Sequence, residues 1–112
     1  MATVDDVCAI ARALPQAVES VSYGTPVFRI RDKTFCSMSR DNSSMGVKVP
    51  RDDRPELIEA EPEKFFIQRN DEGFHWVRVR LAAIDDLDEL RAILIDSWRQ
   101  CAPKSLAATL DD

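Results

Sequence analysis

The stretch SYGTPVFR at residues 22–29 decides the fold of this chain. An apolar pattern of helical period ends before it, at Pro15. Gly24 and Pro26 then favour a turn, because glycine reaches positive φ and proline fixes its own φ. The residues that follow alternate between apolar and basic types, which is the period of a β-strand. The stretch therefore predicts a loop over residues 15–26 that leads into a strand.

The rest of the chain extends this pattern into a sheet. Strands are expected at residues 27–30, 34–38, 45–49, 65–67 and 76–81. Polar connections are expected at residues 31–33, 41–44 and 70–73. Because connections this short join antiparallel neighbours, the sheet should be mainly antiparallel. In the last strand Val77 and Val79 should face the core, with Arg78 and Arg80 on the opposite face.

Helices are expected near both ends of the chain and after the third strand. Thr3 and Asp6 have the spacing of a capping box ahead of an apolar helical stripe. Asp86 should cap a long helix that buries Trp98. Shorter helices are expected around Pro55 and after Pro103. The order α-β-β-β-α-β-β-α-α predicts an α+β fold, with a single antiparallel sheet and helices packed on one face, in one domain over residues 1–112.

The composition limits the functions that the chain can have. The 112 residues carry a net charge of −5 and have an isoelectric point of about 4.9. Such acidity weighs against nonspecific nucleic-acid binding, which depends on Lys and Arg. The apolar runs are too short to cross a membrane and no signal peptide precedes the first helix, so we expect a cytoplasmic protein. The three separated cysteines, Cys8, Cys36 and Cys101, are expected to be buried free thiols.

Basic and aromatic residues should gather on the exposed face of the sheet. They are Arg29, Arg31, Lys48, Trp76, Arg78 and Arg80. Cations around an aromatic ring suit nucleic acid, because phosphates meet the charges and bases stack on the ring. The same face would suit a small anionic or aromatic ligand, or a homodimer partner. The plainer alternative is a solvated face on which arginine stems cover the ring.

Tyr23 is the remaining candidate, and it has two interpretations. It could line a small pocket at the sheet edge, or it could belong to a turn in which Gly24 supplies a positive φ. His75 is the one histidine, and the chain has neither the elbow motif of a serine hydrolase nor the ligand spacing of a zinc site. We therefore expect no catalytic residue, no metal and no cofactor.

Four short motifs make the chain resemble the bacterial MmcQ/YjbR family. They are Tyr23-Gly24-Thr25-Pro26-Val27-Phe28, Lys48-Val49-Pro50, Trp76-Val77-Arg78-Val79-Arg80-Leu81 and Ala102-Pro103-Lys104. The resemblance implies a CyaY-like α+β fold with a double-wing arrangement, for which DNA binding has been proposed. The net negative charge is the point at which this chain departs from that proposal.

Together these observations predict a noncatalytic, cytoplasmic binding module. Its expected partner is nucleic acid or a small anionic or aromatic ligand, held on the basic sheet face. The alternative is a small-molecule binding protein with a pocket near Tyr23 and Trp76. We expect no membrane association, and either a monomer or a weak homodimer.

Overall fold

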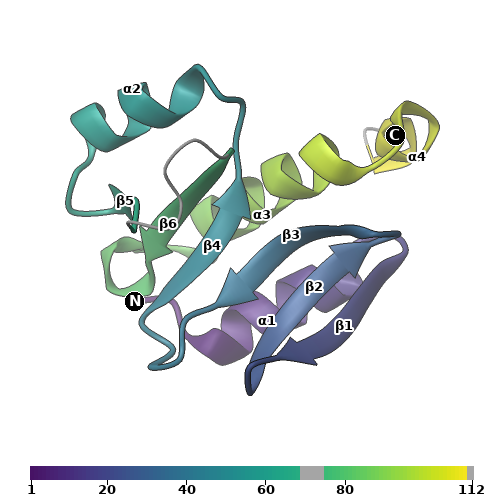
Figure 1. Ribbon diagram of the computed structural model, residues 1–112, viewed down its shortest axis with the longest axis horizontal. Coiled ribbons are helices and arrows are strands. Elements are labelled where there is room, and N and C mark those ends of the chain that lie inside the picture. The colour runs from purple at the N-terminus through teal and green to yellow at the C-terminus, as the bar shows by residue number, and fades with distance from the viewer. Residues whose placement is uncertain (69–74, 111–112) are drawn as a thin grey trace.

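The computed structural model describes residues 1–68 and 75–110 (Figure 1). The elements in chain order are α1 (Val4–Ala13), β1 (Ala17–Ser22), β2 (Thr25–Ile30), β3 (Lys33–Met38), β4 (Ser44–Lys48), α2 (Asp53–Ala60), β5 (Phe65–Phe66), β6 (Trp76–Arg80), the 3-10 helix η2 (Leu81–Ala83), α3 (Leu87–Cys101) and α4 (Lys104–Leu110). The turn expected at residues 70–73 lies outside the described residues.

The strands form one six-stranded sheet in the order β1-β2-β3-β4-β6-β5, and every neighbouring pair is antiparallel. Helices α1 and α3 lie behind the sheet in Figure 1 and cover one of its faces. The predicted α+β fold with an antiparallel sheet is therefore confirmed. Val77 and Val79 are fully buried, as the alternation predicted, and so is Trp98 on α3.

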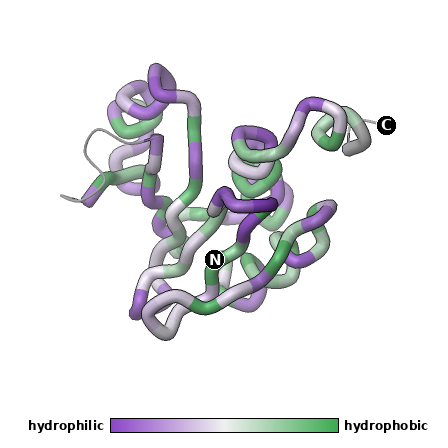
Figure 2. Tube along the Cα trace, turned by 45° about the vertical axis from the view of Figure 1, so that its right-hand side comes forward, coloured by the Kyte–Doolittle hydropathy of each residue, from purple (hydrophilic) through white to green (hydrophobic). Residues whose placement is uncertain are grey.

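The helix termini show why the two long helices begin where they do. Thr3 forms the predicted capping box with Asp6 at the start of α1. The Asp86 carboxylate accepts a hydrogen bond from the Glu89 N–H at 2.7 Å and so caps α3. Helix α2 differs, because its N-cap residue Asp52 makes no side-chain hydrogen bond and none of its residues is buried. Figure 2 shows α2 at the periphery, with hydrophilic and hydrophobic residues mixed around it.

Strand β1 corrects the prediction of a loop over residues 15–26. Ala17–Ser22 pairs with β2 along its whole length, and the two strands are joined by the two-residue turn Tyr23-Gly24. Both turn residues have positive φ, 53° and 80°, as the short hairpin turn requires. The strand was missed because four of its six residues are exposed, so its sequence lacks an alternating apolar pattern.

The sheet divides into two wings at the β3–β4 pair. These strands pair through three positions, Cys36–Val47, Ser37–Gly46 and Met38–Met45. Beyond Cys36 they diverge (Figure 1), which leaves β1-β2-β3 as one wing and β4-β6-β5 as the other.

A β-bulge in β3 accompanies the divergence. Phe28 pairs with Cys36, but Arg29 pairs with Thr34, so Phe35 is an extra residue. A bulge brings two successive side chains towards the same face. This explains why Phe35 and Cys36 are both fully buried, with the Phe35 ring 6.4 Å from the ring of Phe28.

Ser97 of α3 joins the two strands where their own ladder stops. Its hydroxyl oxygen accepts a hydrogen bond from the Lys48 N–H of β4 at 2.8 Å. The same hydroxyl donates to the Phe35 carbonyl of β3. Ser97 is fully buried, and water therefore cannot replace these contacts if the hydroxyl is removed.

We expect Trp98→Ala to lower the free energy of unfolding by about 3–5 kcal/mol, the usual cost of truncating a large core side chain. The Trp98 indole N–H also donates to the Pro15 carbonyl at 3.0 Å. Trp98→Phe loses this donor but keeps an aromatic ring, so it should lower the free energy of unfolding by less than Trp98→Ala does. Urea unfolding followed by circular dichroism measures both variants, and a loss near zero for Trp98→Ala would contradict the assigned core.

We expect Ser97→Ala to lower the free energy of unfolding by about 1–3 kcal/mol, because it leaves a buried N–H without a partner. Ser105→Ala, at an exposed position of α4, is the matched control and should change stability little. If the two variants unfolded at the same urea concentration, the hydrogen bonds of the Ser97 hydroxyl to Lys48 and Phe35 would contribute nothing to stability.

Candidate functional site

The sheet face away from α1 and α3, called here the outer face, is defined by alternation and strand pairing. Its strand residues are Val18, Ser20, Ser22, Thr25, Val27, Arg29, Thr34, Ser37, Ser44, Gly46, Lys48, Phe66, Trp76, Arg78 and Arg80. Four of these residues are cations and none carries a carboxylate, although the whole chain has a net charge of −5. The outer face therefore has the opposite charge to the protein as a whole.

Gly46 of β4 lies at the centre of the outer face. A Cβ atom there would lie 3.3 Å from Arg78 Nη1, 3.3 Å from Trp76 Cε3 and 3.0 Å from Ser37 Oγ. The missing side chain thus lets a guanidinium and an indole converge over the β4 backbone. Both Trp76 and Arg78 are half-buried, so each keeps part of its surface open to solvent.

Arg80 is placed on the outer face but is engaged within the protein. Its Nη1 donates to the carbonyls of Pro62 at 3.2 Å and Glu63 at 3.4 Å. Its guanidinium carbon also lies 4.0 Å from the centroid of the Phe66 ring, which is cation–π geometry. Arg80 therefore holds the segment before β5 against β6, and a ligand would have to displace these contacts to use it.

Lys48 and Trp76 meet at the end of the outer face where β6 begins. They pair across β4 and β6, and they line a pocket of about 350 Å³ together with Val49, His75 and Gln100. The start of β6 is fixed there by Arg54, whose Nη1 donates to the Trp76 carbonyl at 3.2 Å.

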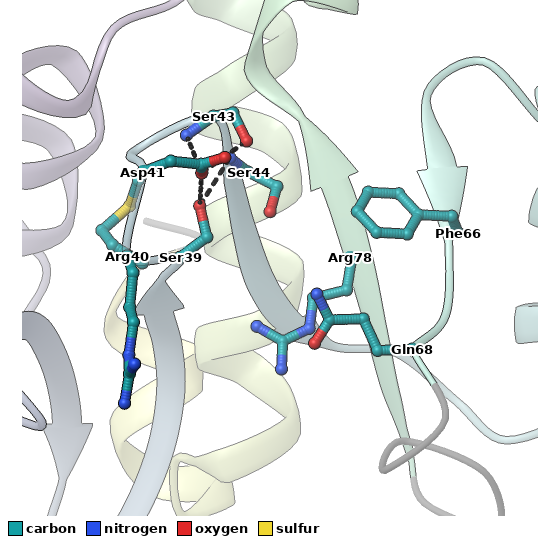
Figure 3. A pocket seen from close by; sticks show the side chains of 9 residues that line it. Ser39, Arg40, Asp41, Ser43, Ser44, Phe66, Gln68 and Arg78 are labelled. Atoms are coloured by element: carbon teal, nitrogen blue, oxygen red, sulfur yellow. Dashed lines mark hydrogen bonds between the residues drawn. The ribbon is translucent and has the colours of Figure 1, made fainter.

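A larger pocket of about 500 Å³ lies at the opposite end of the outer face. Figure 3 shows Phe66, Gln68 and Arg78 on one side of it, and the residues of the β3–β4 turn on the other. The lining residues are Met38, Ser39, Arg40, Asp41, Ser43, Ser44, Phe66, Gln68 and Arg78. Sequence analysis interpreted residues 41–44 as a plain turn and missed this pocket. The run of serines around Asp41 was the available signal.

Asp41 orders the turn beside the larger pocket. Its carboxylate accepts hydrogen bonds from the Ser43 hydroxyl at 2.6 Å, the Ser39 hydroxyl at 2.8 Å and the Ser43 N–H at 3.0 Å. These bonds, the Ser43 hydroxyl first, lower the pKa of Asp41 to about 2. A lowered carboxyl pKa stabilises the fold above the unfolded value, and this contribution is lost as pH falls towards 2. Asp41 is therefore charged at neutral pH, which is the form that accepts these three hydrogen bonds.

The structure does not bring all of the predicted site residues together. Tyr23 is 89% exposed in the β1–β2 turn and lines none of the pockets described here. Tyr23 lies in the turn between β1 and β2, and strands β3 and β4 separate that hairpin from Trp76 on β6. The pocket that Trp76 lines does not include Tyr23. Arg29 lies on the outer face of the other wing. Arg31, with φ of 55°, lies in the β2–β3 turn beside the C-terminal end of α3.

The thiols and metal-binding residue types form no further centre in the part of the chain that the structure describes. Burial raises the pKa of Cys36, and to a smaller degree the pKa values of Cys8 and Cys101. All three are buried free thiols, as predicted, and stay protonated at neutral pH. Within residues 1–68 and 75–110, no three His, Cys, Asp or Glu side chains could together hold a metal ion. No helix in these ranges is long and apolar enough to span a membrane.

The antiparallel sheet with its two wings and covering helices places this chain in a class of small α+β proteins. A profile of the YjbR family matches residues 12–100, well over half of the chain, and the chain therefore belongs to the YjbR family. The crystal structure of Deinococcus radiodurans protein DR2400, a DUF419 domain protein, is similar, with a TM-score of 0.77 and 23% sequence identity over 99% of this chain and 89% of that chain. At this identity the likeness concerns the fold alone. No curated protein matches the chain.

We expect Gly46→Ala to displace the Trp76 ring and the Arg78 guanidinium, because the new methyl group would stand within 3.3 Å of both. Tryptophan emission measures the displacement, since the other tryptophan, Trp98, is fully buried. The free energy of unfolding should fall by about 1 kcal/mol, at the low end for overpacking, because the Arg78 guanidinium and the Ser37 hydroxyl end their side chains and can shift by a few tenths of an ångström. Adding Ser37→Ala removes the 3.0 Å contact and should restore part of the stability. Unchanged emission in Gly46→Ala would contradict this arrangement.

Proposed function

We propose that this protein is a noncatalytic binding module whose outer face binds single-stranded nucleic acid. The observation that carries the proposal is the convergence of Trp76 and Arg78 over Gly46, on a face whose strand residues include no carboxylate. A net charge of −5 would by itself repel phosphates, but the strands segregate their cations from the acidic residues of the helices and turns.

The chemistry of the face matches what a single strand offers. An unpaired base can stack on an exposed aromatic ring, and a guanidinium or ammonium beside it meets the phosphate. Lys48 is the neighbour of Trp76 across the strand pair, and Arg78 is two residues along the same strand. An extended strand crossing from β6 towards β2 would then pass Arg29 on the other wing. The bases of duplex DNA are stacked and paired, so they cannot stack on Trp76. Only its phosphates can contact the cations of the outer face, and duplex DNA should therefore bind less tightly than a single strand.

The acidic remainder of the chain should keep the affinity low. Nonspecific binding at physiological salt has dissociation constants of about 10⁻⁴ to 10⁻⁶ M, and we expect this protein at the weak end. Affinity should fall steeply with salt, because phosphate-bound counterions are released when the cations bind.

Fluorescence anisotropy with labelled single- and double-stranded oligonucleotides, at low and at physiological salt, tests the proposal. The double variant Lys48→Ala with Arg78→Ala should weaken binding and reduce the salt slope by about one unit for each phosphate that the protein no longer neutralises. The control, Arg91→Ala with Lys104→Ala, makes the same change in net charge at exposed helix positions and should leave binding nearly unchanged. No binding by the unmodified protein at low salt, or equal losses in both double variants, would overturn the proposal.

The larger pocket favours a second candidate function, the binding of a small anionic ligand with an apolar part. Its volume of about 500 Å³ lies in the usual range for such sites, and it combines Arg40 and Arg78 with Phe66. The pocket also includes the Asp41 carboxylate, whose Oδ1 is held by Ser39 and Ser43, so its two cations outnumber one carboxylate. A thermal-shift screen of aromatic carboxylates and phosphate esters tests this alternative, since a ligand that binds the folded state raises the melting temperature. A ligand of this pocket should lose its effect in Arg40→Ala, whereas binding of single strands through Trp76 should persist in that variant.

A further inference from the structure

The two edges of the sheet differ in how they are protected. Strand β5 has two residues, and the Arg80 guanidinium stacks beside it on Phe66. Strand β1, at the other edge, has six residues and pairs with β2 without a register shift. It contains no proline, lysine or bulge, which are the features that usually prevent an edge strand from pairing with another chain.

Exposed apolar residues gather along this unprotected edge. Val18 is 58% exposed, Val21 is 70% exposed and Tyr23 follows in the turn. The one charged residue of β1 is Glu19, and Arg12 of α1 binds both of its carboxylate oxygens, at 2.7 and 3.0 Å. The edge therefore presents no unopposed charge to a partner.

The hairpin turn determines which backbone groups of β1 point outward. A two-residue turn closes on a hydrogen-bonded pair, here Ser22 with Thr25, and such pairs then recur at every second residue. The N–H and C=O groups of Glu19 and Val21 therefore point away from β2. The Ala17 N–H is already used, because it donates to the Leu14 carbonyl at 3.1 Å.

We propose that β1 pairs antiparallel with β1 of a second copy of the chain, about a two-fold axis that passes Ser20. In this register Glu19 lies opposite Val21 of the second copy, and the outward groups of these residues form four backbone hydrogen bonds. The register centred on Glu19 is worse on two counts. It places two carboxylates directly opposite each other, and it needs the Ala17 N–H.

The proposed pairing makes the two six-stranded sheets continuous. Because the axis is perpendicular to the sheet, both outer faces lie on the same side. A single edge strand buries less than the roughly 1,200 Å² of stable complexes, so we expect a weak dimer that dissociates on dilution.

Disulfide trapping tests the register directly. Two Ser20 residues would face each other on the axis at a Cα separation of about 4.5 Å, which a disulfide can bridge. Ser20→Cys should therefore form a covalent dimer under mild oxidation. Val18→Cys is the matched control, since it is exposed on the same face but its two copies would lie about 14 Å apart along the strands. The native thiols are buried and should not interfere.

Sedimentation velocity over a wide range of concentrations tests the interaction without a crosslink. The unmodified protein should shift from monomer to dimer as concentration rises. Val21→Pro removes an outward N–H and should abolish the shift, whereas Val21→Thr should retain it; circular dichroism checks that Val21→Pro is folded. A monomer at every concentration, equal crosslinking of the two cysteine variants, or self-association that persists in folded Val21→Pro would each overturn the proposal. Should Val21→Pro fail to fold, the cysteine pair decides.

Discussion

The shape of this protein depends on the two hydrogen bonds that the buried Ser97 hydroxyl makes to β3 and β4. Strands β3 and β4 do not pair beyond Cys36, where a bulge adds Phe35 to β3 and the two strands separate. The hydroxyl of Ser97 satisfies the Lys48 N–H and the Phe35 carbonyl that the separation leaves unpaired. One residue on α3 therefore makes it possible for a single sheet to open into two wings above a closed core.

The sheet carries a charge pattern that the net charge conceals. In the described part of the chain, carboxylates lie on the helices, on the turns and on the helix-covered side of β1, where Glu19 meets Arg12. The outer face carries cations, serines and two aromatic rings, with Gly46 making room at its centre. Of its cations, Arg80 contacts Pro62, Glu63 and Phe66. Lys48 and Arg78 are strand neighbours of Trp76, and the Lys48 side chain also contacts the Cys101 thiol. An acidic protein can therefore present a surface suited to an anion.

Much of this fold could be predicted from local patterns. Period-two alternation identified Val77 and Val79 as core residues, and helical spacing did the same for Trp98. Strand β1 was not predicted, because an exposed edge strand needs no alternation of apolar and polar residues. Ser97 lies 49 positions from Lys48 and 62 positions from Phe35 in the chain. A serine on the apolar stripe of a helix gives no indication of such distant hydrogen-bond partners. Whether Tyr23 and Trp76 lie together depends on the order of the strands, which local patterns do not reveal. The observed order places the two residues towards opposite edges of the sheet.

The central claim is that the outer face is the binding surface, and nuclear magnetic resonance tests it most directly. A ¹⁵N-labelled protein titrated with a short oligothymidylate carries its own control in its two indole N–H groups. The Trp76 indole should shift together with the amides of Lys48 and Arg78. The Trp98 indole, which is buried and bonded to the Pro15 carbonyl, should stay in place. Shifts confined to the helices, or none at oligonucleotide concentrations in the millimolar range, would contradict the account.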